Sequence, residues 1–370
     1  MRILQVIPSL SKGGAERVVV ELANALMDSG NEVTLLAAYP VDPELNQRSL
    51  DENVKVQFIR NKFHNRIFEY IKLPFWIASN WKTLKTYDVI HCHLTYGLIF
   101  GLAISFIRKV TSTKNINLVA TCHSIGVGVS KQPRIINENL SRFFDVFVLM
   151  AEDDTWRKFI IGSRKQNFRI IKNGISPETW SSIQKAPHNI DRFTIGTISR
   201  LQPERKPWLF LEVFAHIRKL SGGNYHFVLG GDGPEKKSLL SLSKELGISQ
   251  DLSIPGLVVH PSEILKNLDC YIGLNVEETS GIAGLEAIFS GIPVVSIQLS
   301  QTYMDGDKDW IFSNQDPQTV AKKIVELLDN PDEVIRLKNM QFRVATQDYS
   351  TQRMCYEYIQ LYRGTQKCIK

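Results

Sequence analysis

The chain has 370 residues and a net charge of +6, with 43% hydrophobic and 22% charged residues. This composition excludes a disordered, collagen-like or disulfide-stapled protein, and a length beyond the roughly 250–300 residues that one core serves predicts two domains. No apolar run reaches the roughly 18–20 residues that span a bilayer, and the cysteines form no CxxC pair, so we expect a protein of the reducing cytoplasm.

Short runs rich in β-branched residues alternate with helix-period segments along the first half of the chain. The expected strands are residues 3–7, 33–37, 54–59, 89–91, 118–121 and 146–150. The first run ends at Pro8 without a small-residue cleavage site, so we interpret it as a strand and not as a signal peptide. Alternating strands and helices predict parallel βαβ units and therefore a doubly wound sheet.

A glycine pair separates the first expected strand from the first expected helix. Gly13 and Gly14 precede AERVVVELANAL, whose apolar residues recur at helical spacing. Backbone amides beside a helix N-terminus favour a phosphate group, although the same pair also fits an ordinary turn.

Residues 54–87 carry seven basic side chains, one acidic side chain and eight aromatic rings. This mixture suits an anionic membrane surface, where cations meet headgroups and rings lie at the apolar boundary, and it would also suit single-stranded nucleic acid. The alternative is an ordinary amphipathic helix with a wet basic face and a buried aromatic face.

Three histidines end expected strands: His91 and His93 in DVIHCHLT, and His123 in VATCHSIG. An HxH pair can hold a metal, but no third ligand lies nearby in the sequence. The aspartates at 305, 307 and 309 lie in a setting that is typical of a turn. We therefore expect no metal site.

The rhythm of strands and helices restarts after residues 174–192, which we interpret as a linker. The expected elements of the second half are strands 193–198, 226–229, 252–254, 270–274 and 294–297, and helices 206–220, 234–246, 281–289, 317–329, 331–345 and about 350–363. The last helix, with Ser350 as its N-cap, is expected to return to the first domain. The predicted domains are thus 1–180, joined by the helix at about 348–370, and 190–347.

Three cations follow the first strand of the second half. Arg200, Arg205 and Lys206 lie in SRLQPERKP, at the sheet edge where doubly wound proteins bind ligands, although a solvated charge run is the alternative. Fixed cations there suit a diphosphate that leaves as a bond breaks. The glycines of GGDGP, which include Gly231, are similar to a dinucleotide fingerprint but lack its third glycine, so we do not expect a dehydrogenase.

Two carboxylates frame the segment EETSGIAGLE. Glu278 and Glu286 are separated by seven residues, and a helix opens at Gly281. The carboxylates, with exposed amides near Ser280 between them, suit the hydroxyl groups of a sugar. Glu286 lies deep in an apolar stretch, where a carboxylate without a partner would be costly, so a polar ligand explains it better than the helix dipole does.

The motifs GGAER (13–17), TCHS (121–124), KNGI (172–175), Arg200 with Lys206, GGDGP (230–234) and the two glutamates occur in an order that resembles glycosyltransferase family four. The resemblance spans essentially the whole chain. It implies the GT-B fold, in which two Rossmann-like, doubly wound α/β domains face each other across a cleft. It also implies a retaining enzyme similar to those of bacterial polysaccharide, lipopolysaccharide O-antigen and capsule assembly.

The resemblance implies a role for each motif. His123, Arg200, Lys206 and Glu278 are the implied catalytic residues, with the two cations on the donor diphosphate. Glu286 is the implied partner of the nucleotide ribose. Ser280 stands where the family commonly has an aromatic residue, which leaves the shape of the sugar pocket open. The other implied donor contacts are Gly13, Gly14, Asn173, Gly174, Gly231, Thr279, Ser280, Gly281 and Ile282, and the implied acceptor contacts are Glu16, Arg17 and His93.

We therefore expect transfer of a hexosyl or N-acetylhexosaminyl group from a nucleotide-diphosphate-sugar to a glycan or polyprenyl-diphosphate-linked acceptor. We expect no metal or other cofactor, and peripheral docking on the inner face of the cytoplasmic membrane. A nucleotide-sugar 2-epimerase of the same fold is the alternative. A noncatalytic nucleic-acid-binding protein is more remote, because it leaves the glutamates and glycine loops unexplained, and we expect no nucleic acid partner.

Overall fold

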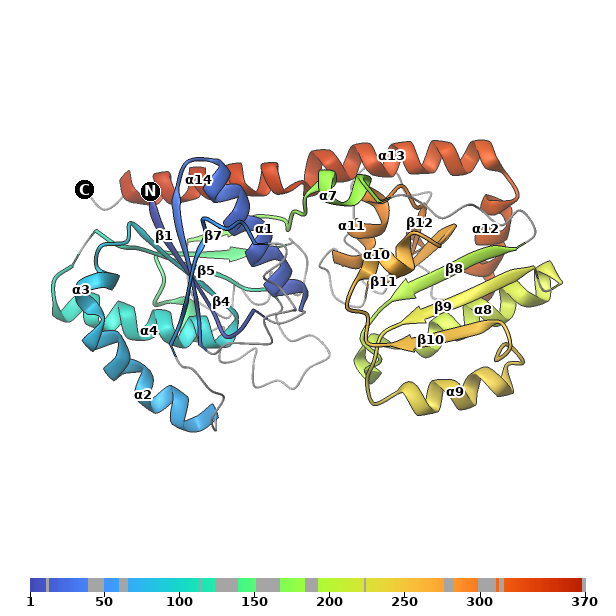
Figure 1. Cartoon of the computed structure of the whole chain (residues 1–370), viewed down its shortest axis with the longest axis horizontal. Coiled ribbons are helices and arrows are strands. Elements are labelled where there is room, and N and C mark those ends of the chain that lie inside the picture. Colours follow the sequence, from blue (N-terminus) through green and yellow to red (C-terminus); the bar gives the residue numbers. More distant parts are fainter. Residues whose placement is uncertain are drawn as a thin grey trace. The chain divides into compact units, whose positions relative to one another are not determined.

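The structure is a computed structural model that describes residues 1–10, 13–38, 50–59, 66–113, 115–123, 139–150, 167–183, 192–222, 224–275, 282–298, 311–312 and 316–367. The chain forms two compact units. One comprises Met1–Gly174 with Ser350–Lys370, and the other comprises Ile175–Tyr349 (Figure 1).

The described part of the first unit contains a seven-stranded parallel sheet in the order β3-β2-β1-β4-β5-β6-β7. Its inner strands are buried almost throughout and mainly apolar, as parallel strands covered on both faces require. The strands are β1 (Arg2–Ile7), β2 (Glu32–Ala37), β3 (Lys55–Phe58), β4 (Val89–His93), β5 (Asn117–Thr121), β6 (Val146–Leu149) and β7 (Phe168–Ile170).

Helices cover both faces of this sheet (Figure 1). They are α1 (Gly14–Asp28), α2 (Arg66–Ser79), α3 (Trp81–Leu84), α4 (Leu94–Val110) and α14 (Thr351–Lys367). The C-terminal α14 packs against α1 and β5. The Ser350 hydroxyl accepts a hydrogen bond from the Arg353 amide at 3.4 Å, as expected of an N-cap. Among the described helices of the whole chain, none combines the length and the apolarity needed to cross a membrane.

The two faces of the first sheet differ in polarity. The face toward α2 and α4 is an apolar core. Because side chains alternate along a strand, the residues between those core positions point to the opposite face, which α14 covers. That face carries buried polar side chains, namely Gln5, His91, His93, Asn117 and Thr121.

The described part of the second unit holds a six-stranded parallel sheet in the order β10-β9-β8-β11-β12-β13. The strands are β8 (Phe193–Ile198), β9 (Tyr225–Gly230), β10 (Leu252–Gly256), β11 (Cys270–Asn275), β12 (Val294–Gln298) and β13 (Ile311–Phe312). The helices are α7 (Pro177–Ser181), α8 (Trp208–Ser221), α9 (Lys236–Glu245), α10 (Pro261–Leu265), α11 (Ile282–Phe289), α12 (Pro317–Leu328) and α13 (Pro331–Tyr349), with a 3₁₀ turn at Pro203–Arg205.

Both sheets share one topology, in which the chain starts in the middle, winds to one edge and then returns to wind to the other. The winding reverses between β1 and β4 in the first unit and between β8 and β11 in the second. Doubly wound proteins bind ligands outside the carboxyl ends of the strands at such a reversal. The fold thus marks one candidate edge in each unit.

The segment between the two units differs from the linker expected at residues 174–192. Its first part forms α7, and Trp180 is buried in the core of the second unit with Ile175. The units divide at Gly174 and Ser350, where a Cβ atom on the glycine would lie 2.3 Å from the Ser350 carbonyl oxygen. Only glycine fits at position 174, because the chain leaves the first unit there and passes directly beside Ser350, where it returns.

Candidate functional site

The glycine pair of the first unit opens α1 after β1. Gly13 is the N-cap, and its carbonyl accepts a hydrogen bond from the Arg17 amide at 3.0 Å. The Glu16 carboxylate lies directly over this turn, because a Cβ atom on Gly13 would meet its Oε2 at 2.0 Å. A phosphate at this helix end would therefore have to displace the Glu16 side chain.

Arg17, an implied acceptor contact, forms an ion pair within the first unit. Its Nε lies 3.3 Å from Oε1 of the buried Glu21, one helical turn along α1. The Thr351 hydroxyl of α14 donates to the other oxygen of the same carboxylate at 3.3 Å. This contact ties α1 to α14, which is a structural role that the sequence pattern did not indicate.

A chain of hydrogen bonds links α14 to the histidine strand β4. Both nitrogens of His91 are engaged, Nδ1 with the Tyr362 hydroxyl at 2.8 Å and Nε2 with the Thr121 hydroxyl at 2.7 Å. The Thr121 hydroxyl also contacts the Tyr358 hydroxyl at 2.8 Å. With both nitrogens occupied, His91 has no lone pair left for a metal.

The other two histidines pair with each other at the strand ends. Nδ1 of His93 lies 2.9 Å from Nε2 of His123. The side chains are 1% and 9% exposed. Among the described residues, no group bonds the outer nitrogens, Nε2 of His93 and Nδ1 of His123. Sequence analysis placed both residues at strand ends but did not pair them.

Burial keeps these histidines neutral. It lowers the pKa of His123 to about 4, and it lowers the pKa of His91 and of His93 well below the ordinary value, with a smaller contribution from the neighbouring imidazoles. A buried imidazolium would lose its hydration, and none of the carboxylates that the structure describes is placed to compensate it. The three rings therefore form a neutral polar layer at pH 7.

We predict that the protein loses stability as the pH falls from about 6.5 toward 5. The folded-state pKa values of the three histidines lie below the unfolded value, so in this window the unfolded chain binds more protons. Each histidine contributes a slope of about 1.4 kcal/mol per pH unit. Urea denaturation at pH 7.5, 6.5, 5.8 and 5.0 measures the free energy of unfolding, and its change with pH is the sum of the three contributions. Equal free energies of unfolding across this range would contradict the buried neutral layer.

The second unit presents two cations at the carboxyl end of β8. Arg200 is exposed and Lys206 is half-buried. Neither forms an ion pair with any residue that the structure describes. Lys206 has a left-handed backbone (φ 46°, ψ 50°), which is uncommon for a residue other than glycine. Such strain persists where the surrounding structure imposes it and is concentrated at functional sites.

Gly231 supports the loop that carries these cations. It has φ 146°, and a Cβ atom there would lie 1.8 Å from the Ser199 carbonyl oxygen. The Leu201 amide donates to the Asp232 carbonyl at 3.0 Å, which fastens the loops after β8 and β9 together. The structure thus gives Gly231 a packing role beside the donor contact that the resemblance implies.

Glu286 lies in α11 and is 5% exposed. The helix is apolar and its second half is buried on every side. Burial, with a smaller contribution from the Glu286 charge, raises the pKa of Tyr271 to about 12, so the carboxylate lies near this phenol of β11. Ile282 opens the same helix. A carboxyl group therefore lies in the interior near Tyr271, whose hydroxyl donates to the Ile198 carbonyl at the end of β8 at 3.2 Å.

The other implied site residues are buried near α14 or are not described. Asn173 is buried, and the Gly174 amide donates to the Met354 sulfur at 3.2 Å, so Gly174 lies against the start of α14. Glu278, Thr279, Ser280 and Gly281 lie outside the described residues, as do the aspartates at 305, 307 and 309. Within the described ranges, no group of three His, Cys, Asp or Glu side chains is placed to hold a metal.

Comparisons with known proteins agree with this geometry. A family model described as Glycosyltransferase Family 4 matches residues 12–179, and one described as Glycosyl transferases group 1 matches residues 178–343. The crystal structure of Anabaena HepE in complex with UDP and glucose has a similar fold, with a TM-score of 0.75 at 18% identity over 98% of this chain and 99% of that one.

Two curated relatives are similar over most of their length. One is the Campylobacter jejuni "GalNAc-alpha-(1->4)-GalNAc-alpha-(1->3)-diNAcBac-PP-undecaprenol alpha-1,4-N-acetyl-D-galactosaminyltransferase", 26% identical over 85% of this chain and 83% of that protein. The other is the Bacillus anthracis N-acetyl-alpha-D-glucosaminyl L-malate synthase, 21% identical over 87% of this chain and 86% of that protein.

Proposed function

Because this chain belongs to the GT-B glycosyltransferases that join a family 4 domain to a group 1 domain, we propose that it transfers a sugar from a nucleotide-diphosphate-sugar to a glycan acceptor with retention of configuration. The observation that carries the proposal is the pair of cations, Arg200 and Lys206, which have no ion-pair partner among the described residues and lie at the β8–β11 reversal of the second unit. Cations at that edge stabilise the charge of a departing diphosphate.

The proposed reaction needs no strong base. Retention requires the acceptor hydroxyl to approach the face of the sugar from which the diphosphate leaves, and the diphosphate then takes the hydroxyl proton. The protein contributes orientation and fixed positive charge. The relative from Campylobacter jejuni is named for an undecaprenol-diphosphate-linked substrate, which supports a polyprenyl-diphosphate-linked acceptor. The proposed transferred group is a hexosyl or an N-acetylhexosaminyl group.

A ligand screen followed by a transfer assay tests this function. UDP- and GDP-linked sugars are screened for protection against thermal unfolding, because a ligand at 100 times its Kd stabilises the folded state by about 2.7 kcal/mol. The protecting sugar is then incubated with polyprenyl-diphosphate-linked glycans, and the anomeric configuration of the product is determined by NMR. An inverted product would refute the retaining reaction. Release of an epimerised nucleotide-sugar without acceptor would assign the 2-epimerase instead.

We predict that transfer survives a chelator. In the proposed reaction Arg200 and Lys206 neutralise the negative charge of the leaving diphosphate, so no bound metal ion is required. The assay is repeated with excess EDTA, and the rate is expected to stay within about twofold of the untreated value. Replacing the aspartates at 305, 307 and 309 by asparagine is the matched control, with the same result expected. Loss of turnover that Mg²⁺ or Mn²⁺ restores would contradict the proposal.

We also propose that the first unit docks on an anionic membrane surface. The described residues of the 54–87 segment divide into two groups. Trp76, Trp81 and Tyr87 pack against the core, as the amphipathic alternative predicted. Phe75, by contrast, is 75% exposed on α2.

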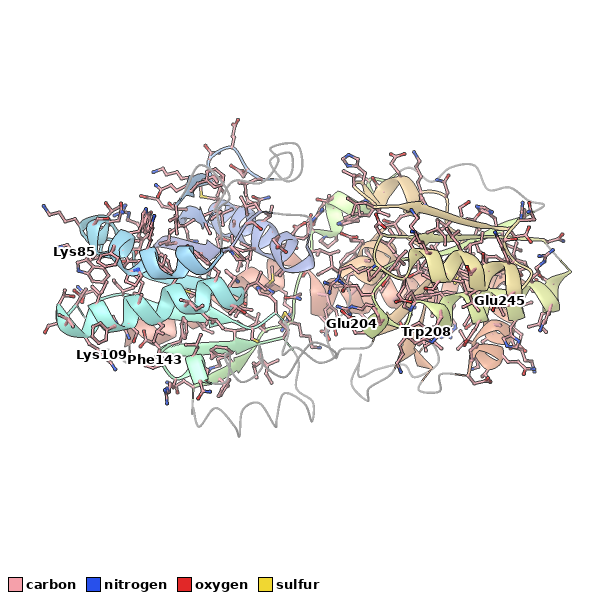
Figure 2. All side chains as sticks on the ribbon, turned by 90° about the horizontal axis from the view of Figure 1, so that it is seen from below. Lys85, Lys109, Phe143, Glu204, Trp208 and Glu245 are labelled. Atoms are coloured by element: carbon pink, nitrogen blue, oxygen red, sulfur yellow. The ribbon has the colours of Figure 1, made fainter. Side chains whose placement is uncertain are left out.

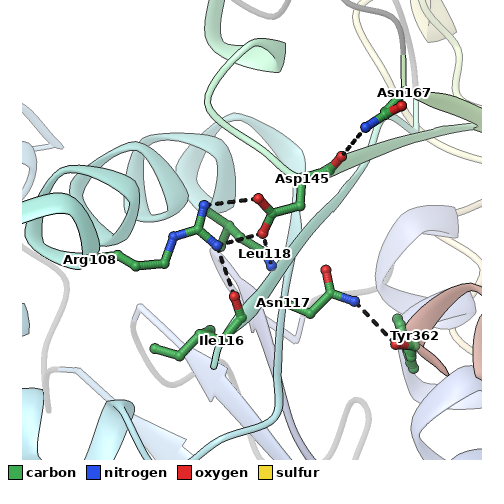
Figure 3. Close-up of polar contacts among 7 residues, drawn as sticks. All are labelled: Arg108, Ile116, Asn117, Leu118, Asp145, Asn167 and Tyr362. Atoms are coloured by element: carbon green, nitrogen blue, oxygen red, sulfur yellow. Dashed lines mark hydrogen bonds and ion pairs between the residues drawn. The ribbon is translucent and has the colours of Figure 1, made fainter. Parts of the chain in front are cut away.

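The exposed groups around Phe75 have the chemistry of a membrane contact. Lys72, Lys82 and Lys85 are all exposed. The neighbouring helix α4 adds two exposed apolar side chains, Phe106 (68%) and Val110 (71%). Lys85 and Lys109 project from the same end of the first unit (Figure 2). Arg108 is held by Asp145 and is not available for lipid (Figure 3).

We predict that reversing three of these charges strongly weakens vesicle binding. Each basic residue near an anionic surface contributes about 1 kcal/mol, so the triple change Lys72, Lys82 and Lys85→Glu should lower the partition coefficient by about 100-fold or more. Co-sedimentation with phosphatidylglycerol vesicles measures it. The matched control carries the same charge change at Lys219, Lys237 and Lys244, which are exposed on the second unit. Equal binding by wild type and both variants would contradict the proposal.

A further inference from the structure

The hydrogen bond between His93 and His123 constrains what the pair can offer a ligand. A neutral imidazole has one N–H donor and one lone pair. The contact between Nδ1 of His93 and Nε2 of His123 uses one donor and one lone pair. Whichever ring donates, the two outer nitrogens are left as one donor and one acceptor. A neutral pair therefore presents both hydrogen-bonding functions and no charge.

This presentation fits a hydroxyl group. A hydroxyl donates one hydrogen bond and accepts others, so it matches either arrangement of the shared proton. A phosphate, which only accepts, finds one donor and no positive charge. Both outer nitrogens are buried, and no described residue bonds either of them. Buried nitrogens of this kind are costly when unsatisfied, so a ligand group is the expected partner.

Neighbouring residues of the first sheet fix the position of the His93 ring. The ring of His91 lies against the ring of His93 with centroids 4.0 Å apart. His91 is itself fixed at both nitrogens by Tyr362 and Thr121. Directly after His93, Leu94 has a left-handed backbone with φ 59°. Backbone strain at a bulky residue requires support from its surroundings and recurs at functional sites.

We propose that His93 is a positioning residue that acts through His123, holding that ring so that its outer nitrogen, Nδ1, binds a hydroxyl group of the sugar substrate. This inference rests on the proposed function, because it takes the ligand to be a sugar. The resemblance implied that His93 contacts the acceptor directly. In the structure Nδ1 of His93 is bonded to His123 at the carboxyl ends of β4 and β5, which gives His93 the positioning role, and its direct contact with the acceptor stays a prediction.

Two substitutions at one position separate positioning from packing. His93→Asn keeps a hydrogen-bonding group near the place of Nδ1, whereas His93→Phe keeps the ring and removes the bond. We expect His93→Phe to lower kcat more than about tenfold at an unchanged KM for the nucleotide-sugar, and His93→Asn to recover most of the loss. Equal loss in both variants, or none in either, would overturn the positioning role.

A spectroscopic measurement tests the pair without catalysis. In wild-type protein labelled with ¹⁵N-histidine, we expect a nitrogen–nitrogen coupling through the hydrogen bond between His93 and His123 at pH 7. Its absence would overturn the inference even if both variants fail to fold. Presence of the coupling in a protein with no transferase activity would refute the proposed function and leave the pair intact, so the two failures are distinguishable.

Discussion

Replacing Lys206 by glycine is expected to lower kcat/KM for sugar transfer by about ten- to 150-fold while leaving the protein at least as stable as wild type. The left-handed backbone of Lys206 costs a residue with a side chain about 1–2 kcal/mol, and glycine avoids that cost. Part of this gain is offset because glycine has more freedom in the unfolded chain. The net change in the free energy of unfolding should lie between zero and about 1 kcal/mol of stabilisation.

The expected loss of activity comes from the missing charge. A hydrogen bond to a charged group contributes about 1.5–3 kcal/mol, so kcat/KM should fall by about ten- to 150-fold. Lys206→Arg keeps the charge and should keep more activity than Lys206→Gly. Urea denaturation and the transfer assay are run on all three proteins. A well-folded Lys206→Gly enzyme with near-normal activity would remove the diphosphate role.

Glu286 supplies the matched test inside the same unit. Glu286→Gln retains the volume of this buried side chain and removes its charge, so folding should be kept while the affinity for nucleotide-sugar falls more than about tenfold. If the variant binds the nucleotide-sugar as tightly as wild type, Glu286 does not hold the ribose. A loss in this variant and in Lys206→Gly, with both proteins folded, would support one donor site.

The inner strands could be predicted from the sequence because burial on both faces makes them mainly apolar, with few polar residues such as Gln5 and His91 among them. The strand over Phe193–Ile198 has the expected bounds. The edge strands β7 and β13 were missed, since three and two residues are too few to display a period. The helix α7 was missed for a similar reason, because its five residues lie in a Pro- and Ser-rich stretch.

The candidate site was less predictable because it depends on strand order. His93 and His123 could each be placed at a strand end, but only the adjacency of β4 and β5 brings them within 2.9 Å. One of the two hydrogen-bond partners of His91, Tyr362, lies 271 residues away along the chain. Periodicity marks Tyr362 as a core position, yet it says nothing of where its hydroxyl points.

The conformation of Lys206 was likewise invisible in the sequence. Lysine has no preference for a left-handed backbone, and no pattern around it predicts one. Proximity to a strand end gave the expectation of a functional cation, and the structure adds the strain and the missing ion pair within the described residues. The local sequence therefore predicts where a charge lies. The backbone strain of Lys206 and its lack of an ion pair among the described residues become visible only in the folded structure.

Tyr362→Ala is expected to destabilise the first unit more than truncation of an exposed side chain on the same helix. Tyr362 is fully buried, its hydroxyl bonds His91 at 2.8 Å, and its carbonyl accepts from the Asn117 amide at 3.4 Å (Figure 3). Truncating a buried aromatic side chain to alanine costs about 3–5 kcal/mol, because the cavity cannot collapse fully. The loss should appear as a lower urea midpoint.

Two further variants separate the cost of lost packing from the cost of the lost hydrogen bond. Tyr362→Phe keeps the ring and leaves Nδ1 of His91 unsatisfied, which should cost about 1–3 kcal/mol. Tyr356→Ala, at a position 64% exposed on the same helix, should change stability by less than about 0.5 kcal/mol. If Tyr362→Phe were as stable as wild type, the hydrogen bond between Tyr362 and His91 would contribute nothing to the stability of the folded protein.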